Sequence, residues 1–190
     1  MNHQDKILLI LDLDETLIHA TTTQLSSAPN FQVFKYLVYK RPFLEDFLTT
    51  CNQFFDLAVW SSASDDYVKE IVENIFPENL PLKFVWGRSR CTPKSQNQIN
   101  EFGYYDGFDH YHYNKHLIKV KKQGYDLRRV LIVEDTPSKV ANSYGNAIYI
   151  KEYKGEKEDN YLLLLSKYLL TLKDVENVRT LEKRGWEKRI

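Results

Sequence analysis

The sequence predicts an α/β fold in which helices cover a central parallel sheet. Four short, almost uninterrupted apolar runs alternate with segments whose apolar residues recur at helical spacing. Continuous apolar runs are typical of strands that are buried on both faces, as the strands of parallel sheets are. Because strands and helices alternate along the chain, we expect the sheet to lie between helical layers.

The four expected strands determine where polar residues gather. They are ILLILDLD (7–14), FFDLAVWSS (54–62), RVLIVEDTP (129–137) and NAIYI (146–150). The first three end in acidic or hydroxyl residues. Ligands of open α/β sheets bind outside the carboxyl ends of the strands, so we expect these polar clusters to meet at one edge.

The expected helices lie between and after these strands. They are RPFLEDFLTTCNQ, SDDYVKEIVENIF, KHLIKVKKQG and TPSKVANSYG. The last two end on Gly124 and Gly145, and glycine is typical just after a helix. We expect residues 157–190 to form a helical tail, beginning with the packing helix KEDNYLLLLSKYLLTL.

Composition limits the classes of protein that the chain can belong to. Its length of 190 residues favours one domain over 1–190. Lysine and arginine total 26, as do aspartate and glutamate, so net charge supports neither a nucleic-acid nor a membrane partner. Cys51 and Cys91 are too few for a disulfide scaffold, and we expect free thiols. Without a signal peptide or membrane span, a soluble cytoplasmic protein is expected; the oligomeric state is not predicted.

One segment breaks the alternation of strands and helices. Residues 92–113, TPKSQNQINEFGYYDGFDHYHY, are polar, aromatic and long for a plain loop. We hypothesise an inserted loop that lies over the active site and shapes substrate choice; the alternative is a loop that packs on the domain's own flank. The histidines of HYHYNKH raise the possibility of zinc, but no cysteine or strict ligand spacing accompanies them.

Acidic residues at two strand ends predict a magnesium site. Asp12 and Asp14 are two residues apart, which on a strand places both carboxylates on one face. Such carboxylates repel each other unless a cation lies between them. Mg²⁺ suits them because it takes hard oxygen ligands and keeps exchangeable waters. The alternative for Asp12 and Asp14 is a capping aspartate beside a solvated one. Glu134 and Asp135 form a second acidic pair, for which the alternative is the opening of a turn before Pro137.

Two further positions are suited to binding a phosphoryl group. Ser61 and Ser62 end the second run, and a hydroxyl there can donate to a phosphoryl oxygen. Alternatively the serine caps the next helix, a role for which Ser64 is better placed. Lys115 follows Asn114, a candidate N-cap, which would put an ammonium in the first turn of a helix. This placement opposes the helix dipole unless an anion binds nearby; the alternative is a solvated lysine.

These residues together resemble a known family. DLDET after an apolar strand, a hydroxyl, a lysine and an acidic pair resemble the haloacid dehalogenase superfamily of phosphatases. LDLDETLIHA, YKRPFLEDFL, VWSSASDDYV and DLRRVLIVEDTP resemble more closely the phosphatases related to the RNA polymerase II carboxy-terminal-domain phosphatases, the NLI-interacting factor-like family. The resemblance runs from about residue 7 to residue 150. It implies a three-layer Rossmann-like fold without a large cap domain.

The resemblance also implies a mechanism. Asp12 would be the nucleophile that forms an aspartyl-phosphate. Asp14 would act as general acid and then base, with its backbone carbonyl on Mg²⁺. Thr16 would hold the loop and orient Asp14. Ser61 and Lys115 would bind phosphoryl oxygens.

The remaining expected site residues are a metal pair and two substrate-binding residues. By the same resemblance Asp135 completes the magnesium site beside Asp12 and Asp14, with Glu134 close by. Arg88 in WGRSRC matches an arginine near the phosphate, and Ser62 is a further candidate for contacting substrate.

Departures from the family pattern leave the substrate open. Threonine is more common at Ser61, and Glu134 is one methylene longer than the usual aspartate, so it reaches the metal either directly or through water. The stretch before YKRP is shorter than in polymerase-tail phosphatases, which argues against a polymerase tail as substrate. We expect a protein Ser/Thr phosphatase-like enzyme acting on a phosphorylated protein. The alternatives are a small-molecule or nucleotide phosphatase or phosphotransferase and, less favoured because both aspartates are present, an inactive phosphoprotein-binding module.

Overall fold

A five-stranded parallel sheet forms the centre of the protein. The computed structural model describes residues 6–95 and 111–190. The strand order is β10-β9-β1-β5-β6, and every neighbouring pair is parallel. The strands are β1 (Ile7–Leu11), β5 (Phe55–Trp60), β6 (Leu82–Trp86), β9 (Val130–Glu134) and β10 (Ala147–Tyr149). The predicted parallel sheet is confirmed, and β6 is an edge strand that the apolar pattern did not reveal.

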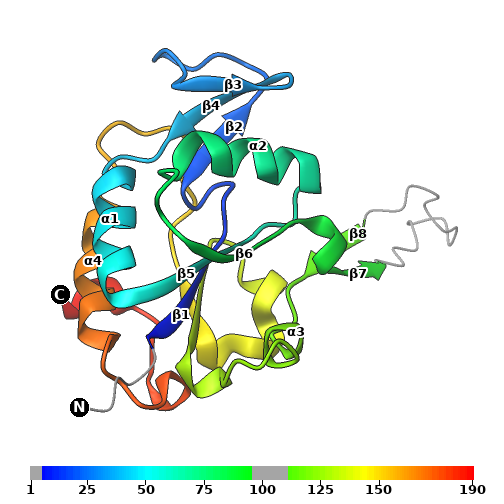
Figure 1. Ribbon diagram of the computed structural model, residues 1–190. Coiled ribbons are helices and arrows are strands. Elements are labelled where there is room, and N and C mark those ends of the chain that lie inside the picture. Colours follow the sequence, from blue (N-terminus) through cyan, green and yellow to red (C-terminus); the bar gives the residue numbers. More distant parts are fainter. Residues whose placement is uncertain (1–5, 96–110) are drawn as a thin grey trace, which may run out of the picture.

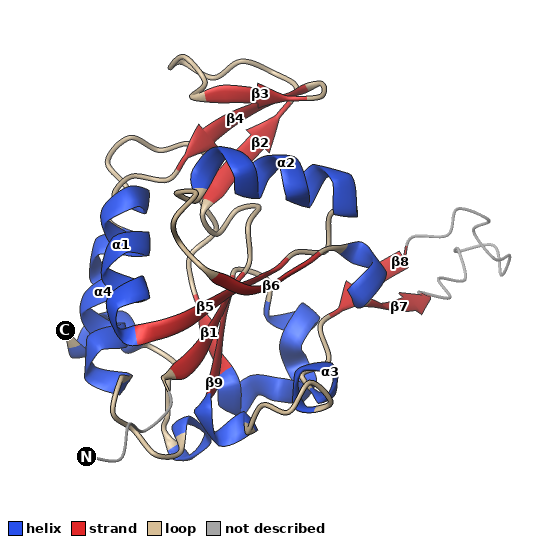
Figure 2. Cartoon of the chain, in the orientation of Figure 1, coloured by secondary structure: helices blue, strands red, loops and turns tan. Residues whose placement is uncertain are grey.

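Two hydrophobic cores, one on each face of the sheet, confirm the layered arrangement. Side chains of β1 alternate between them: Ile7, Leu9 and Leu11 belong to one core, and Leu8 and Ile10 to the other. The first core is covered by α1 (Leu44–Phe54), α2 (Asp65–Ile75) and α4 (Tyr161–Leu172), and the second by α3 (Ile118–Lys121) and the 3₁₀ segment Pro137–Asn146. Figures 1 and 2 show the sheet running between these groups of helices.

The crossover between β9 and β10 differs from the predicted helix. Residues Pro137–Asn146 form a kinked 3₁₀ segment with non-helical dihedral angles at Val140 and Ser143. The segment is rich in asparagine and serine, whose side chains compete for backbone hydrogen bonds and so disfavour a regular α-helix. Gly145 therefore lies inside the segment and does not end a helix. Gly124, by contrast, adopts a positive φ of 95° just after α3, as expected of a helix-ending glycine.

Two small antiparallel sheets were not predicted. One has the order β2-β4-β3, from β2 (Ile18–Thr21), β3 (Phe31–Val33) and β4 (Tyr36–Lys40), and lies beside α2 at the top of Figure 1. The other pairs β7 (Thr92–Ser95) with β8 (Tyr111–Asn114). The expected inserted loop at 92–113 thus begins and ends as paired strands. Residues 96–110, which include His110 of the zinc hypothesis, lie outside the residues that the structure describes.

The C-terminal tail is only partly helical. After α4 the chain forms two short 3₁₀ turns, Val178–Thr180 and Trp186–Arg189. The indole of Trp186 is buried, stacks on Tyr168 with ring centroids 5.5 Å apart, and donates to the carbonyl of Tyr149 at 2.7 Å. This indole fastens the tail to α4 and β10.

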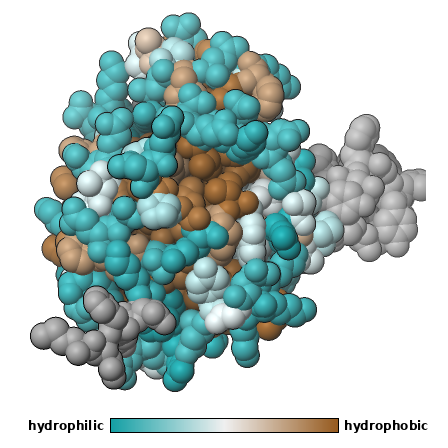
Figure 3. Space-filling model, in the orientation of Figure 1, coloured by the Kyte–Doolittle hydropathy of each residue, from teal (hydrophilic) through white to brown (hydrophobic). Residues whose placement is uncertain are grey.

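The face drawn in Figure 3 is mainly hydrophilic. Figure 3 shows an apolar area near the middle of the face drawn in Figure 1. Val85 of the edge strand β6 is 41% exposed. Cys51 and Cys91 are both buried and free, as expected. Among the helices of the described residues, none combines the length and hydropathy that crossing a membrane requires.

Candidate active site

The carboxyl ends of β1, β5 and β9 bring together the polar clusters that the sequence separates. Asp12 directly follows β1, is 1% exposed, and donates its backbone N–H to the carbonyl of Val133 at the end of β9. Ser61 follows β5, whose Val59 pairs with Leu11, so Ser61 lies beside the end of β1. Glu134 ends β9 and Asp135 follows it. The predicted meeting of the three clusters at one edge is therefore observed.

A buried lysine links the two acidic clusters. The Nζ atom of Lys115 is 2.6 Å from Oδ1 of Asp12 and 2.6 Å from Oε2 of Glu134, and its side chain is 0% exposed. Burial alone would raise the pKa of Asp12, but Lys115 and Lys139 outweigh it, so the pKa of Asp12 lies below its usual value. Asp12 is therefore held as a carboxylate, the form that a nucleophile needs.

The route by which Lys115 reaches the site differs from the expectation. Asn114 is the last residue of β8, and α3 begins only at Ile118, so Lys115 lies between a strand and a helix. Its backbone N–H donates to the carbonyl of Lys139 at 2.7 Å. The pairing of β8 with β7 and this hydrogen bond position the ammonium, and a helix dipole takes no part.

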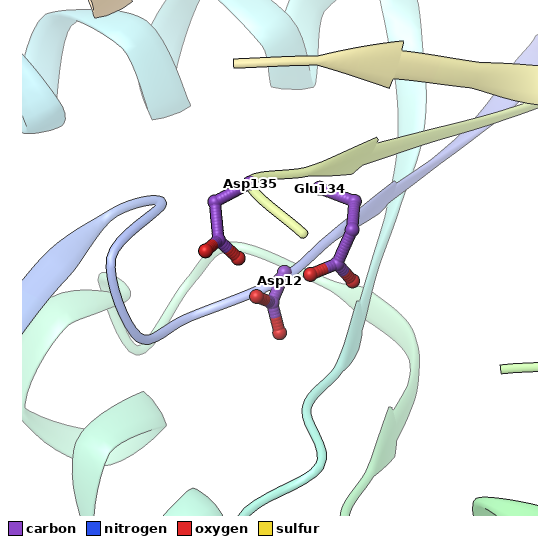
Figure 4. A group of neighbouring side chains, drawn as sticks. All are labelled: Asp12, Glu134 and Asp135. Carbon is purple, nitrogen blue, oxygen red and sulfur yellow. The ribbon is translucent and has the colours of Figure 1, made fainter. Parts of the chain in front are cut away.

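Three carboxylates form a candidate metal centre. One oxygen from each of Asp12, Glu134 and Asp135 lies within 4.8 Å of the others. Figure 4 shows the three side chains converging from the ends of β1 and β9. Oδ1 of Asp135 is buried without a hydrogen-bond partner, although Thr136 donates its hydroxyl to Oδ2 at 2.8 Å. Burial and the charge of Asp12 raise the pKa of Glu134 above its ordinary value, and the charges of Lys115 and Lys139 oppose this rise. An all-oxygen donor set with a spare buried oxygen and an excess of negative charge fits a hard divalent cation such as Mg²⁺.

Asp14 occupies a different environment from Asp12. The hydroxyl of Tyr67, from α2, donates to Oδ1 of Asp14 at 2.6 Å. Burial raises the pKa of Asp14, the hydrogen bond from Tyr67 opposes this and the charge of Asp12 adds to it, giving a pKa of about 6. Two carboxylates two residues apart thus differ in acidity, the arrangement that separates a nucleophile from a general acid.

A pocket opens beside Asp14. Its volume is about 290 Å³, and its lining includes Glu15, Phe34, Tyr36, Tyr67 and Arg88. Phe34 lies between β3 and β4 with a positive φ of 51° and is 63% exposed. The small β2-β4-β3 sheet therefore supplies aromatic walls to a pocket whose charged residues, Asp14, Glu15 and Arg88, follow strands of the central sheet.

Hydrogen bonds from Thr16 and Arg41 hold the loop that carries Asp12 and Asp14. The hydroxyl of Thr16 donates to Oδ2 of Asp12 at 3.4 Å. We expected Thr16 to orient Asp14, but the structure shows it in contact with Asp12. Nη1 of Arg41 donates to the carbonyl of Thr16 at 3.0 Å, while Nε and Nη2 each lie 2.8 Å from a carboxylate oxygen of Asp159. Arg41 is the arginine of the KRP motif, which now has a physical role.

The three residues expected to bind the phosphate, Ser61, Ser62 and Arg88, have different surroundings. Ser61 is buried, and its hydroxyl accepts the backbone N–H of Ala63 at 3.0 Å, while Ser64 precedes α2 as its N-cap. Nε of Arg88 donates to the carbonyl of Ser62 at 3.0 Å, and its guanidinium lies over the ring of Tyr113, 5.0 Å from the centroid. Arg88 thus lines the pocket, whereas Ser62 contributes its backbone carbonyl to holding that arginine.

Sequence reasoning missed Lys139, the second lysine of the site. Its Nζ is 3.3 Å from Oε1 of Glu134, 3.7 Å from Oδ1 of Asp135 and 4.0 Å from Oδ2 of Asp12. Burial lowers the pKa of Lys139, but the three carboxylates more than offset this and raise it above its ordinary value. The available signal was the spacing, because a lysine four residues after Asp135 returns to it across one turn.

Known proteins resemble the chain along most of its length. It is 32% identical over 181 residues to the CTD small phosphatase-like protein 2 of Dictyostelium discoideum, covering 92% of this chain and 29% of that protein. It is 27% identical over 192 residues to the CTD nuclear envelope phosphatase 1 homolog of Drosophila melanogaster, covering 93% of this chain and 72% of that one. The nuclear envelope morphology protein 1 of Saccharomyces cerevisiae is 27% identical over 208 residues, covering 96% of this chain and 43% of the relative.

These relatives correct one expectation. Several are named as proteins of the nuclear envelope, which overturns the expected cytoplasmic location. Charge balance and hydropathy describe the surface of the folded domain. They carry no information about which compartment or partner retains a protein, and that is why the inference from composition was wrong.

The family is established by a match over almost the whole chain. The structure resembles that of Fcp1, an essential RNA polymerase II CTD phosphatase, with a TM-score of 0.55 and 17% identity over 90% of this chain and 51% of the other. A fission yeast Fcp1 variant bound to beryllium fluoride gives a TM-score of 0.53 and 17% identity over 97% of this chain and 54% of that one. These likenesses confirm the expected fold. The model of the NLI interacting factor-like phosphatases matches residues 7–179, and the chain belongs to that family.

Proposed function

We propose that the chain is a magnesium-dependent phosphomonoester hydrolase that passes the phosphoryl group through Asp12 and acts on phosphorylated serine or threonine in proteins. The observation that carries the proposal is the setting of Asp12. Its carboxylate is buried at a strand end between the ammonium of Lys115 and the hydroxyl of Thr16, two residues from a carboxyl group with a pKa of about 6. A structural ion pair alone would not require the second, differently tuned carboxyl group.

In the first step a carboxylate oxygen of Asp12 bonds to phosphorus while the bond from phosphorus to the substrate oxygen breaks. Asp14 gives its proton to the departing alkoxide. A pKa of about 6 leaves part of Asp14 protonated near neutral pH, and the hydroxyl of Tyr67 fixes the orientation of the carboxyl group.

In the second step Asp14, now a carboxylate, takes a proton from water. The water oxygen bonds to phosphorus, and the bond from phosphorus to Asp12 breaks. This releases inorganic phosphate and regenerates the Asp12 carboxylate, with Asp14 protonated for the next cycle.

Fixed cations account for the binding of the phosphoryl group. Lys115 and Arg88 present positive charge to its oxygens, and Ser61 offers a hydroxyl. Mg²⁺, when bound, would neutralise phosphoryl charge. We assign Asp12, Asp135 and the carbonyl of Asp14 to it. Both oxygens of Glu134 already have partners, Lys115 on one and the Thr136 N–H with Lys139 on the other, which favours an indirect role for Glu134.

The pocket beside Asp14 supports a protein substrate. Its aromatic walls suit the side chain of a residue next to the phosphorylated one. The relative in Dictyostelium discoideum is named a CTD small phosphatase-like protein, which agrees with this choice. The alternative class, small phosphomonoesters or nucleotides, remains a defined outcome of the experiment below.

The experiment has two arms. Hydrolysis of p-nitrophenyl phosphate is measured with and without Mg²⁺ for the wild type, for Asp12→Asn and for the exposed control Lys122→Met. We expect magnesium-dependent turnover that Asp12→Asn reduces by at least about 10³ and the control leaves unchanged. A rapid acid quench should trap an acid-stable, hydroxylamine-labile phosphoenzyme only when Asp12 is present. Turnover without that adduct would refute the aspartyl-phosphate, and faster turnover of nucleotides than of phosphopeptides would refute the substrate class.

A further inference from the structure

The ammonium of Lys139 lies beside the three carboxylates of the candidate metal centre, where a bound cation would be stabilised. It faces all three carboxylates of the candidate metal centre, at 3.3 Å from Glu134, 3.7 Å from Asp135 and 4.0 Å from Asp12. Lys139 belongs to the 3₁₀ segment that follows β9, so its backbone is fixed close to the acidic pair. An internal cation therefore neutralises part of the charge that a divalent metal would neutralise.

The two lysines of the site are held differently. Lys115 makes contacts of 2.6 Å to two carboxylates, and its side chain is 0% exposed. The contacts of Lys139 are longer, and its side chain is 25% exposed, so it has a path to solvent. At 3.7 Å Lys139 is too far to hydrogen-bond Oδ1 of Asp135, and that buried oxygen has no other partner. Lys115 is thus the more tightly held of the two lysines, and Lys139 is the one that solvent reaches.

We propose that Lys139 is a built-in counterion that holds the carboxylates of Asp12, Glu134 and Asp135 in the metal-free protein and must leave them when Mg²⁺ binds. It thereby lowers the affinity of the site for the metal and stabilises the metal-free fold. This inference rests on the metal centre of the proposed function and concerns what that centre does before the metal arrives.

The direction of the effect follows from charge. Two ammonium groups face three carboxyl groups, and removal of Lys139 leaves the cluster with a larger negative charge. The attraction between a divalent cation and the cluster then rises, since charges about 4 Å apart interact appreciably even in the partly screened setting of a protein. Without metal the same change destabilises the fold, because buried carboxylates lose a compensating charge.

The experiment compares Lys139→Met, which keeps length and removes charge, with Lys139→Arg, which keeps charge. The matched control is Lys122→Met, the same change at an exposed lysine just after α3. Mg²⁺ binding is measured by calorimetry, and thermal unfolding is followed in EDTA and in saturating Mg²⁺. We expect Lys139→Met to bind Mg²⁺ at least about tenfold more tightly than the wild type. Its melting temperature should be lower in EDTA, with a larger rise on adding Mg²⁺, while Lys139→Arg and the control stay close to the wild type.

Each outcome separates the hypotheses. Equal or weaker Mg²⁺ binding by Lys139→Met would overturn the counterion role and leave the proposed function standing. Absence of binding to wild type and variant alike would overturn the metal centre and this inference together. If Lys139→Met does not fold even with Mg²⁺, Lys139→Gln takes its place, and the same shift in affinity is required of it.

Discussion

The buried ion pair between Arg41 and Asp159 supports the catalytic loop, and its removal should destabilise the fold strongly. The side chains are 0% and 5% exposed, and the pair is bidentate, with both contacts at 2.8 Å. The third contact of the guanidinium is the carbonyl of Thr16. Asp159→Ala would leave a buried guanidinium without its carboxylate, which is costly because the charge cannot return to water.

The magnitude can be worked from these contacts. Removing one partner of a buried pair costs about 3–5 kcal/mol. The rings of Tyr153 and Tyr161 lie 5.3 and 5.4 Å from the guanidinium and retain some stabilisation, so we expect the lower end of the range. For a chain of this size each kcal/mol lowers the melting temperature by about 2–4 °C, giving a decrease of roughly 6–12 °C.

Urea unfolding followed by circular dichroism measures the loss of stability. Asp159→Asn keeps the shape and one acceptor, so it should fall between Asp159→Ala and the wild type. Lys69→Ala removes an exposed pair with Glu73 at 3.8 Å and serves as the control, with an expected change below about 0.5 kcal/mol. A loss for Asp159→Ala no larger than that of the control would refute the idea that this pair supports the loop.

Three further predictions concern the site and the core. Tyr67→Phe removes the hydrogen bond to Asp14 and should lower kcat/KM for alkyl phosphates roughly 10-fold or more. The loss should be smaller for p-nitrophenyl phosphate, because its leaving group needs little protonation. Equal losses for both substrates would contradict the role of Tyr67 in positioning Asp14 as the acid. Phe34→Ala should raise KM for phosphopeptides by up to about tenfold without changing stability, since the ring is exposed at the pocket; an equal effect on p-nitrophenyl phosphate would exclude a peptide subsite. Burial raises the pKa of the Cys51 thiol, so it should resist thiol reagents at pH 8 in the native protein and react in urea; rapid native labelling would show that the core opens.

Strands β1, β5, β9 and β10 and the helices α1 to α4 could be predicted because their signals are local. An apolar run such as β1 is buried whatever lies elsewhere in the chain, and α1, α2 and α4 carry apolar residues at helical spacing. The β2-β4-β3 sheet has no such signal. Its strands have three to five residues with mixed burial, and antiparallel pairing with one another determines their structure.

The same distinction applies to the site. Asp12, Asp14 and the acidic pair after β9 stand at strand ends, where sequence position alone indicates a ligand site. Tyr67 and the partner of Arg41 depend on pairings that only the fold creates; Tyr67 and Asp14 are 53 residues apart, and Arg41 and Asp159 are 118 residues apart. Thr16 shows the limit of motif reasoning, because its place was predicted correctly and its hydrogen-bond partner was not.

The charges at this edge of the sheet are arranged for reaction more than for stability. If stability alone had shaped the cluster, well-packed apolar residues in place of Asp12, Lys115 and Glu134 would serve as well or better. The chain instead keeps a partly exposed lysine at Lys139, a buried oxygen of Asp135 without a hydrogen bond and a carboxyl group at Asp14 with a pKa of about 6. Each is a cost in the resting protein. Under the proposed function each becomes an advantage when a metal and a phosphoryl group bind, because preorganised charge need not rearrange during the reaction. The rigid strands β1 and β9 sustain that cost, since the two buried cores on either side hold the strand ends in place.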